Sequence, residues 1–75
     1  MTSAALEAAL RFFARRRPFR PFWLELLSGD RIKATHPEAV RLVGALFVDR
    51  SPDRALRLFP AESVCQVFDE PAENQ

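Results

Sequence analysis

The sequence predicts an α+β domain, mainly β, in which an N-terminal helix is followed by a five-stranded, strongly bent antiparallel small barrel. Residues 3–17 carry apolar side chains at helical spacing, whereas residues 22–68 contain short runs in which apolar and polar side chains alternate. The segments between these runs are too short for a crossover helix, so neighbouring strands should pair antiparallel. Seventy-five residues fit a single domain with a small core.

The first predicted element is the helix over residues 3–17. Ser3 is a suitable N-cap, and Leu6, Leu10 and Phe13 recur at i, i+4 and i+7, which places them on one apolar stripe. Pro18 should end the helix, because the residue before a proline avoids helical conformations.

A hairpin is predicted next, with strands over residues 22–27 and 31–35. Gly29 in the turn supplies the positive φ that a tight hairpin requires. The alternation divides each strand into an inner and an outer face. Phe22, Leu24 and Leu26 share one face of the first strand, and Ile32 and Ala34 should face inward in the second.

The remaining segments are shorter and less regular. Residues 39–43 fit either a bent strand or a single helical turn, residues 45–49, 55–59 and 64–68 have the length and pattern of strands, and residues 51–53 and 60–63 read as turns. Cys65 lies among apolar residues and should be a buried, inert thiol. Residues 69–75 form an acidic tail that should fray.

Two segments resemble the Sm-like fold. Residues 24–32 are similar to the first Sm motif, and residues 61–64 look like the short turn that leads into that family's last strand. The resemblance implies RNA binding and, by analogy with the Hfq family, rings in which the last strand of one subunit pairs with the fourth strand of the next. Phe59-Pro60 stands where Hfq has its Lys-His pair, so that RNA pocket does not carry over.

The chain also resembles short uncharacterised bacterial proteins that share a Pro-Phe-Arg-Pro-Phe segment, a Gly-containing hairpin and a His-Pro dipeptide. Residues 18–22, Gly29 and His36-Pro37 match these features. This likeness implies a type of protein and assigns no activity.

Charge is unevenly distributed along the chain. Residues 1–41 hold eight Lys or Arg and four acids, giving +4, whereas residues 42–75 hold three and six, giving −3. Arginines can fork onto phosphates, so we expect a non-catalytic module that binds RNA or single-stranded DNA. The expected nucleic-acid-binding residues are Arg11, Arg15, Arg16, Arg17, Arg20 and Lys33.

The alternative is a protein-interaction adapter or a homo-oligomeric assembly subunit that uses strand edges and an aromatic patch. Its expected contact residues are Phe19, Trp23 and Val67, with Phe22 completing the patch. The competing interpretation of the same segment places Phe19, Phe22 and Trp23 in the core and pairs the arginines with Glu25, Glu38 or a neighbour's acidic tail.

The residue types in the chain do not predict an enzyme or a metal-binding protein. His36 is the only histidine, Cys65 is the only cysteine and the chain has two glycines, so a catalytic triad, a metal site and a Gly-rich phosphate loop are not expected. No cofactor is expected. The absence of a long apolar run and the single cysteine favour a cytoplasmic protein without a membrane span.

Overall fold

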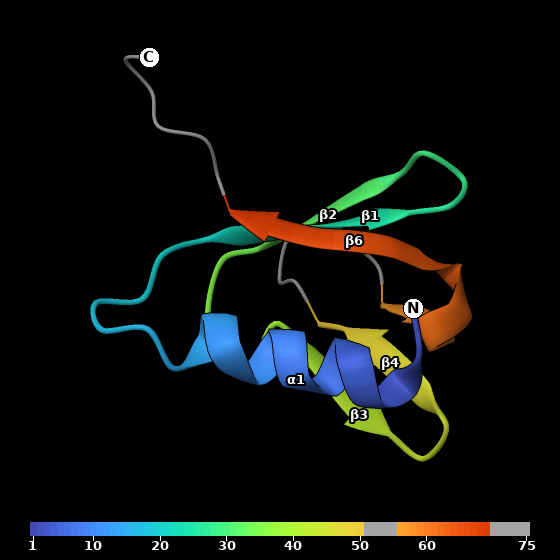
Figure 1. Cartoon of the computed structure of the whole chain (residues 1–75), viewed down its shortest axis with the longest axis horizontal. Coiled ribbons are helices and arrows are strands. Elements are labelled where there is room, and N and C mark those ends of the chain that lie inside the picture. The colour runs from blue at the N-terminus through green and yellow to red at the C-terminus, as the bar shows by residue number, and fades with distance from the viewer. Residues whose placement is uncertain (51–55, 70–75) are drawn as a thin grey trace.

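The computed structural model describes residues 1–50 and 56–69. One helix and six strands occur there, in two antiparallel sheets of three strands each (Figure 1). The first sheet has the order β2-β1-β6 and the second has the order β3-β4-β5. The elements are α1 (Ser3–Ala14), β1 (Phe22–Leu26), β2 (Arg31–Ala34), β3 (Val40–Val43), β4 (Leu46–Asp49), β5 (Arg57–Phe59), the 3-10 helix η1 (Ala61–Ser63) and β6 (Val64–Asp69).

The predicted five-stranded barrel is wrong, because neither sheet closes on the other. In a closed barrel of few strands, the strands must be long enough to bend and to pair with neighbours in both sheets. Here the chain leaves the first sheet after Ala34 and enters the second at Val40, and the intervening segment contains Pro37, which cannot donate a backbone hydrogen bond. β5 spans only three residues and pairs with β4 alone.

The helix is shorter than predicted. It ends at Ala14, three residues before the expected end, and Arg15 caps it by donating its backbone N–H to the carbonyl of Arg11 at 3.1 Å. Thr2, not Ser3, is the N-cap, because the Thr2 hydroxyl accepts the backbone N–H of Ala5 at 3.0 Å. The extra residues that were assigned to the helix instead form the connector to β1.

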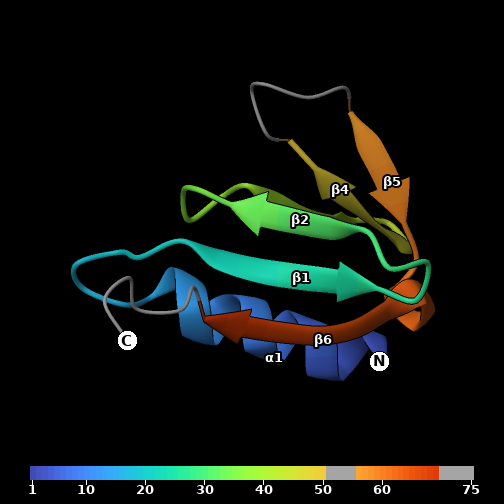
Figure 2. The same cartoon turned by 90° about the horizontal axis from the view of Figure 1, so that it is seen from above.

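The predicted apolar stripe of α1 does face the core. Leu6 is fully buried, and Leu10 and Phe13 pack against the core cluster. Phe13 stacks on Phe22 of β1 with ring centroids 5.0 Å apart. The helix therefore covers the inner side of the first sheet, and Figure 2 shows it behind β1 and β6.

The first hairpin forms as predicted. β1 and β2 pair antiparallel, with Trp23 opposite Lys33 and Leu24 opposite Ile32, and Gly29 in the turn has a φ of 97°. Ile32 and Ala34, which were predicted to face inward, are buried, and so are Phe22, Leu24 and Leu26, which were predicted to share one face of the first strand.

The second sheet settles the open alternative for residues 39–43. Residues 40–43 form the strand β3, which pairs with β4 through a turn at Gly44, where φ is 63°. Phe47 of β4 and Phe59 of β5 are opposite each other and stack with ring centroids 6.2 Å apart on the inner face. The predicted turn at residues 51–53 lies outside the described residues.

Cys65 is exposed, so the prediction of a buried thiol is wrong. In the pairing of β1 with β6, Glu25 is opposite Gln66 and Leu26 is opposite Val64, which leaves Cys65 as the extra residue of a β-bulge. The bulge lets Val64 and Val67 both face the core side although they are three residues apart. Strict alternation could not anticipate this shift.

The last strand extends one residue further than predicted, to Asp69, which is therefore part of the sheet. The rest of the predicted acidic tail, residues 70–75, lies outside the described part of the chain. Across residues 1–50 and 56–69, no helix has the length and apolar character needed to span a membrane.

Candidate nucleic-acid interface

A shallow groove of about 360 Å³ runs along the solvent side of α1 and its C-cap. Its lining residues lie at i, i+3, i+4, i+7 and i+8, which is one face of a helix. They are Ala8, Arg11, Phe12, Arg15 and Arg16. We call this surface the helix groove. The small side chain of Ala8 leaves room for the groove, and the larger side chains form its walls.

Phe12 is the aromatic residue of the helix groove, and 67% of it is exposed. It meets Phe13 edge to face, with centroids 5.3 Å apart and an interplanar angle of 88°. Phe12 is not among the residues predicted to bind nucleic acid, although the Phe12-Phe13 pair in the sequence indicates its position. Adjacent helical residues point about 100° apart, so when Phe13 faces the core Phe12 must lie outside the apolar stripe.

Arg11 and Arg15 line the helix groove together with Phe12 and are exposed. Within residues 1–50 and 56–69, neither guanidinium has a carboxylate within ion-pair distance. An anion that enters the helix groove therefore does not have to displace an internal ion pair from these two arginines. Arg11 and Arg15 are four residues apart, and both line the helix groove.

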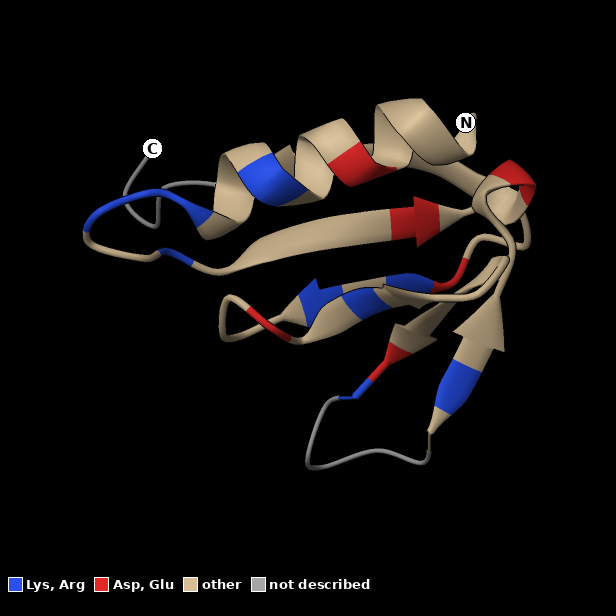
Figure 3. Ribbon diagram, turned by 90° about the horizontal axis from the view of Figure 1, so that it is seen from below, with Lys and Arg blue, Asp and Glu red and all other residues tan. Residues whose placement is uncertain are grey.

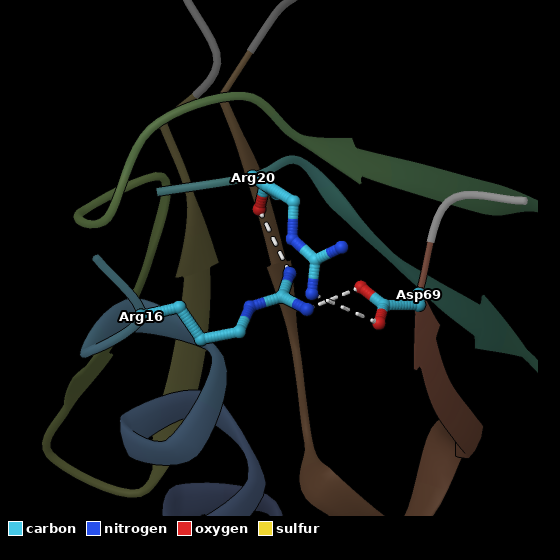
Figure 4. A network of polar contacts seen from close by, with 3 residues as sticks. All are labelled: Arg16, Arg20 and Asp69. Carbon is cyan, nitrogen blue, oxygen red and sulfur yellow. Dashed lines mark hydrogen bonds and ion pairs between the residues drawn. The ribbon is translucent and has the colours of Figure 1, made fainter. Parts of the chain in front are cut away.

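Arg16 differs from its neighbours because it is built into the fold. Its side chain is 14% exposed, and its Nη1 donates to Oδ1 of Asp69 at 2.5 Å (Figure 4). Its Nη2 donates to the carbonyl of Arg20 at 3.0 Å, and its guanidinium lies 4.8 Å from the centroid of the Phe13 ring. Arg16 thus ties the helix end, the connector and the end of β6 together.

The connector places the other two predicted arginines near this junction. Arg20 is 64% exposed at its side chain and its Nη2 lies 3.8 Å from Oδ2 of Asp69, which is a loose ion pair. Arg17 is exposed and its Nη1 donates to the carbonyl of Arg16 at 3.4 Å. Positive charge therefore continues from α1 along the connector (Figure 3). The competing interpretation paired the arginines with Glu25, Glu38 or a neighbour's acidic tail, whereas Arg16 and Arg20 pair with Asp69 of the same chain.

Lys33 and Trp23 are separated from the helix groove. They face each other on the outer face of the first sheet, with Lys33 Nζ 5.6 Å from the Trp23 ring centroid, while α1 packs on the inner face. The structure therefore divides the predicted nucleic-acid-binding residues between two surfaces.

The predicted aromatic patch is not a continuous surface. Phe22 is 2% exposed and belongs to the core, and Phe19 packs edge to face on it with centroids 6.2 Å apart. Val67 is opposite Leu24 and packs against the same core. Of the four residues expected in this contact surface, only Trp23 lies on an outer face. The competing assignment of the aromatic residues to the core is therefore correct for Phe19 and Phe22 and wrong for Trp23.

Comparisons with protein-family models, with curated proteins and with solved structures found no match. The resemblance to Sm-like proteins therefore stays a prediction. Among the residues placed in the structure, no three His, Cys, Asp or Glu side chains gather in a group that could hold a metal ion. The chemistry offered by the helix groove is that of exposed guanidinium groups beside an exposed aromatic ring.

Proposed function

We propose that the protein is a non-catalytic module that binds RNA or single-stranded DNA through the helix groove. The observation that carries the proposal is the position of Phe12, which is 67% exposed in the same groove as Arg11 and Arg15. Exposing a phenyl ring to water is unfavourable, and stacking a nucleobase on such a ring contributes about 1–3 kcal/mol per base. A ligand with planar bases and regularly spaced phosphates matches both residue types.

Each residue of the helix groove has a separate role in this proposal. Phe12 stacks a base, while Arg11 and Arg15 contact the phosphates on either side of it. Contacts of this kind do not read the hydrogen-bonding edges of the bases, so the proposal includes little sequence preference. A cytoplasmic location, predicted from the single cysteine, is compatible with such a ligand.

Fluorescence anisotropy with labelled oligouridylate tests the proposal. Phe12→Ala should weaken binding about 5- to 150-fold, which corresponds to the loss of one stacked base. Replacing both Arg11 and Arg15 by alanine should weaken binding and reduce the slope of log K against log salt by about 0.7 per lost phosphate contact.

Arg41→Ala is the matched control, because Arg41 is an exposed arginine on β3 of the second sheet. It should leave the affinity nearly unchanged, although it removes the same charge. Equal losses for Arg41→Ala and for the single substitutions Arg11→Ala and Arg15→Ala would mean that net charge alone drives binding, and the absence of any binding would refute the proposal.

A second candidate function, self-association or docking of a protein partner, is favoured by the outer face of the second sheet. Three aliphatic side chains are exposed there, and Val43 and Leu46 are cross-strand partners. Their exposed fractions are 60% for Val43, 39% for Leu46 and 56% for Leu58. Light scattering over a range of protein concentrations tests this candidate, since a mass that rises with concentration supports it and a constant monomer mass argues against self-association.

A further inference from the structure

We propose that the outer face of the first sheet is a second contact surface for the same nucleic acid, on which bases stack on Trp23 and Phe68. This inference rests on the proposed function. The strand register places three residues in one row across the sheet, because Trp23 of β1 is opposite Lys33 of β2 on one side and opposite Phe68 of β6 on the other. Two aromatic rings and a cation thus lie side by side on one face.

The cations of this face lie close to the rings. The Arg31 guanidinium carbon is 5.5 Å from the Phe68 centroid, and Lys33 Nζ is 5.6 Å from the Trp23 centroid. The Arg31 side chain is 58% exposed. Glu25, in the neighbouring row, lies 3.8 Å from Arg31 Nε and accepts a hydrogen bond from Gln66, so part of its charge is already offset. The row therefore combines stacking surfaces with positive charge.

A base and its phosphate can replace these internal contacts. An exposed cation–π contact is weaker than a base stacked on an aromatic ring, and a cation that leaves the ring can pair with the phosphate of the same nucleotide. Long Lys and Arg side chains can make this move without a change in the backbone.

The outer face and the helix groove meet at the end of β6. Asp69 follows Phe68 directly, and the same carboxylate pairs with Arg16, which lines the helix groove, and with Arg20. The two surfaces lie on opposite sides of the first sheet, as Figures 1 and 2 show for α1 and the strands. A single strand is flexible enough to pass around this end of the sheet, whereas a duplex is too stiff. The inference therefore specifies a single-stranded ligand.

The intrinsic fluorescence of Trp23 tests the inference without any substitution, because Trp23 is the only tryptophan of the chain. The probe is a labelled oligothymidylate of roughly 16 nucleotides, at the upper end of single-strand site sizes. We expect tryptophan quenching with the same midpoint as the rise in anisotropy. A rise in anisotropy with unchanged tryptophan emission would overturn the inference while leaving the proposed function intact. No rise in anisotropy would refute both.

A pair of variants on β6 provides the second test. Phe68→Ala removes a ring from the outer face, and Cys65→Ala is the control at an exposed position of the same strand. We expect Phe68→Ala to weaken oligothymidylate binding about 5- to 150-fold and Cys65→Ala to weaken it less than about twofold. Circular dichroism and urea midpoints that match the parent protein show that both variants are folded. Equal effects of the two substitutions, or equally tight binding of a duplex, would overturn the inference.

Discussion

The two sheets share one core but present different outer faces. On the first sheet, the rings of Trp23 and Phe68 lie beneath the cations Lys33 and Arg31. On the second sheet, the outer face carries three exposed aliphatic side chains, Val43, Leu46 and Leu58, together with the exposed Arg41. Both sheets bury apolar side chains on their inner faces, but the inner face of the second sheet also buries a carboxylate, Asp49, which is 2% exposed.

The difference shows that the inner and outer positions of these strands have different roles. The apolar inner residues determine whether the sheets pack, and they tolerate changes that keep their volume and their apolar character. The outer residues determine what each face can bind. Cations that lie on aromatic rings suit a face for a charged, planar ligand, whereas exposed aliphatic side chains suit a face that another protein surface covers.

The largest expected effect on stability comes from a substitution at an inner position of the second sheet. Phe47→Ala removes a fully buried ring from β4, which should lower the free energy of unfolding by about 3–5 kcal/mol. A domain this small has little stability to spare, so the variant should be largely unfolded. Val43→Ala, on the outer side of the same hairpin, should change stability by about 0.5 kcal/mol or less. Urea unfolding followed by circular dichroism measures both, and similar losses for the two variants would contradict the division into inner and outer positions.

The next effect compares the turns of the two sheets, which contain Gly29 in the first sheet and Gly44 in the second. A Cβ would meet nothing within 4 Å at either position, so substitution costs backbone strain alone. Gly44 has a φ of 63°, in the left-handed region, and Gly44→Ala should cost about 1 kcal/mol. Gly29 has a φ of 97°, which is less accessible to other residues, and Gly29→Ala should cost about 2 kcal/mol. Gly44→Asn is the control, because Asn tolerates the left-handed region. A larger loss at Gly44 than at Gly29 would contradict this order.

A smaller effect concerns the ion pair that bridges the sheets. Arg57 Nη2 of β5 donates to Oδ2 of Asp30 in the turn of the first hairpin at 2.8 Å, and the two side chains are 40% and 58% exposed. Exposed pairs contribute at most about 1 kcal/mol. A double-mutant cycle with Arg57→Ala and Asp30→Ala should give a coupling energy below that value, and the coupling should decrease in high salt. A coupling above about 2 kcal/mol would mean that the pair fixes the angle between the sheets.

The smallest effect on stability separates the two outer faces. Leu58→Arg gives the second sheet an exposed charge and should change the free energy of unfolding by about 0.5 kcal/mol or less. If the aliphatic face is covered by a second copy, the same variant should lower the mass measured by light scattering and leave oligonucleotide affinity unchanged. A loss of oligonucleotide binding in Leu58→Arg would instead join the two faces in one function.

Much of the local structure could be predicted from alternation and turn chemistry. Gly29 and the pattern of residues 22–35 define the first hairpin, because an inner and an outer face alternate without interruption there. The separation into two sheets could not be predicted, since it depends on which strands pair, and pairing is a long-range property. The β-bulge at Cys65 could not be predicted from the alternation either, because one extra residue reverses the face of the residues that follow it.

The candidate site was predicted only as a cluster of charge. The arginines of residues 11–20 stand out in the sequence, but their different environments depend on tertiary contacts. Arg16 is held by Asp69, which is far away in the sequence, whereas Arg11 and Arg15 remain exposed. Phe12 could have been identified from helical geometry, because its neighbour Phe13 already occupied the apolar stripe.

The bulge in β6 has a practical consequence for measuring the molecule. It turns the one thiol of the chain, Cys65, toward solvent on an edge strand, while the one indole, Trp23, lies on the adjacent strand β1. A maleimide acceptor dye attached to that thiol would form an energy-transfer pair with the indole in the unmodified sequence. The separation of these two strands could then be followed in solution, while the protein refolds or while it meets its ligand.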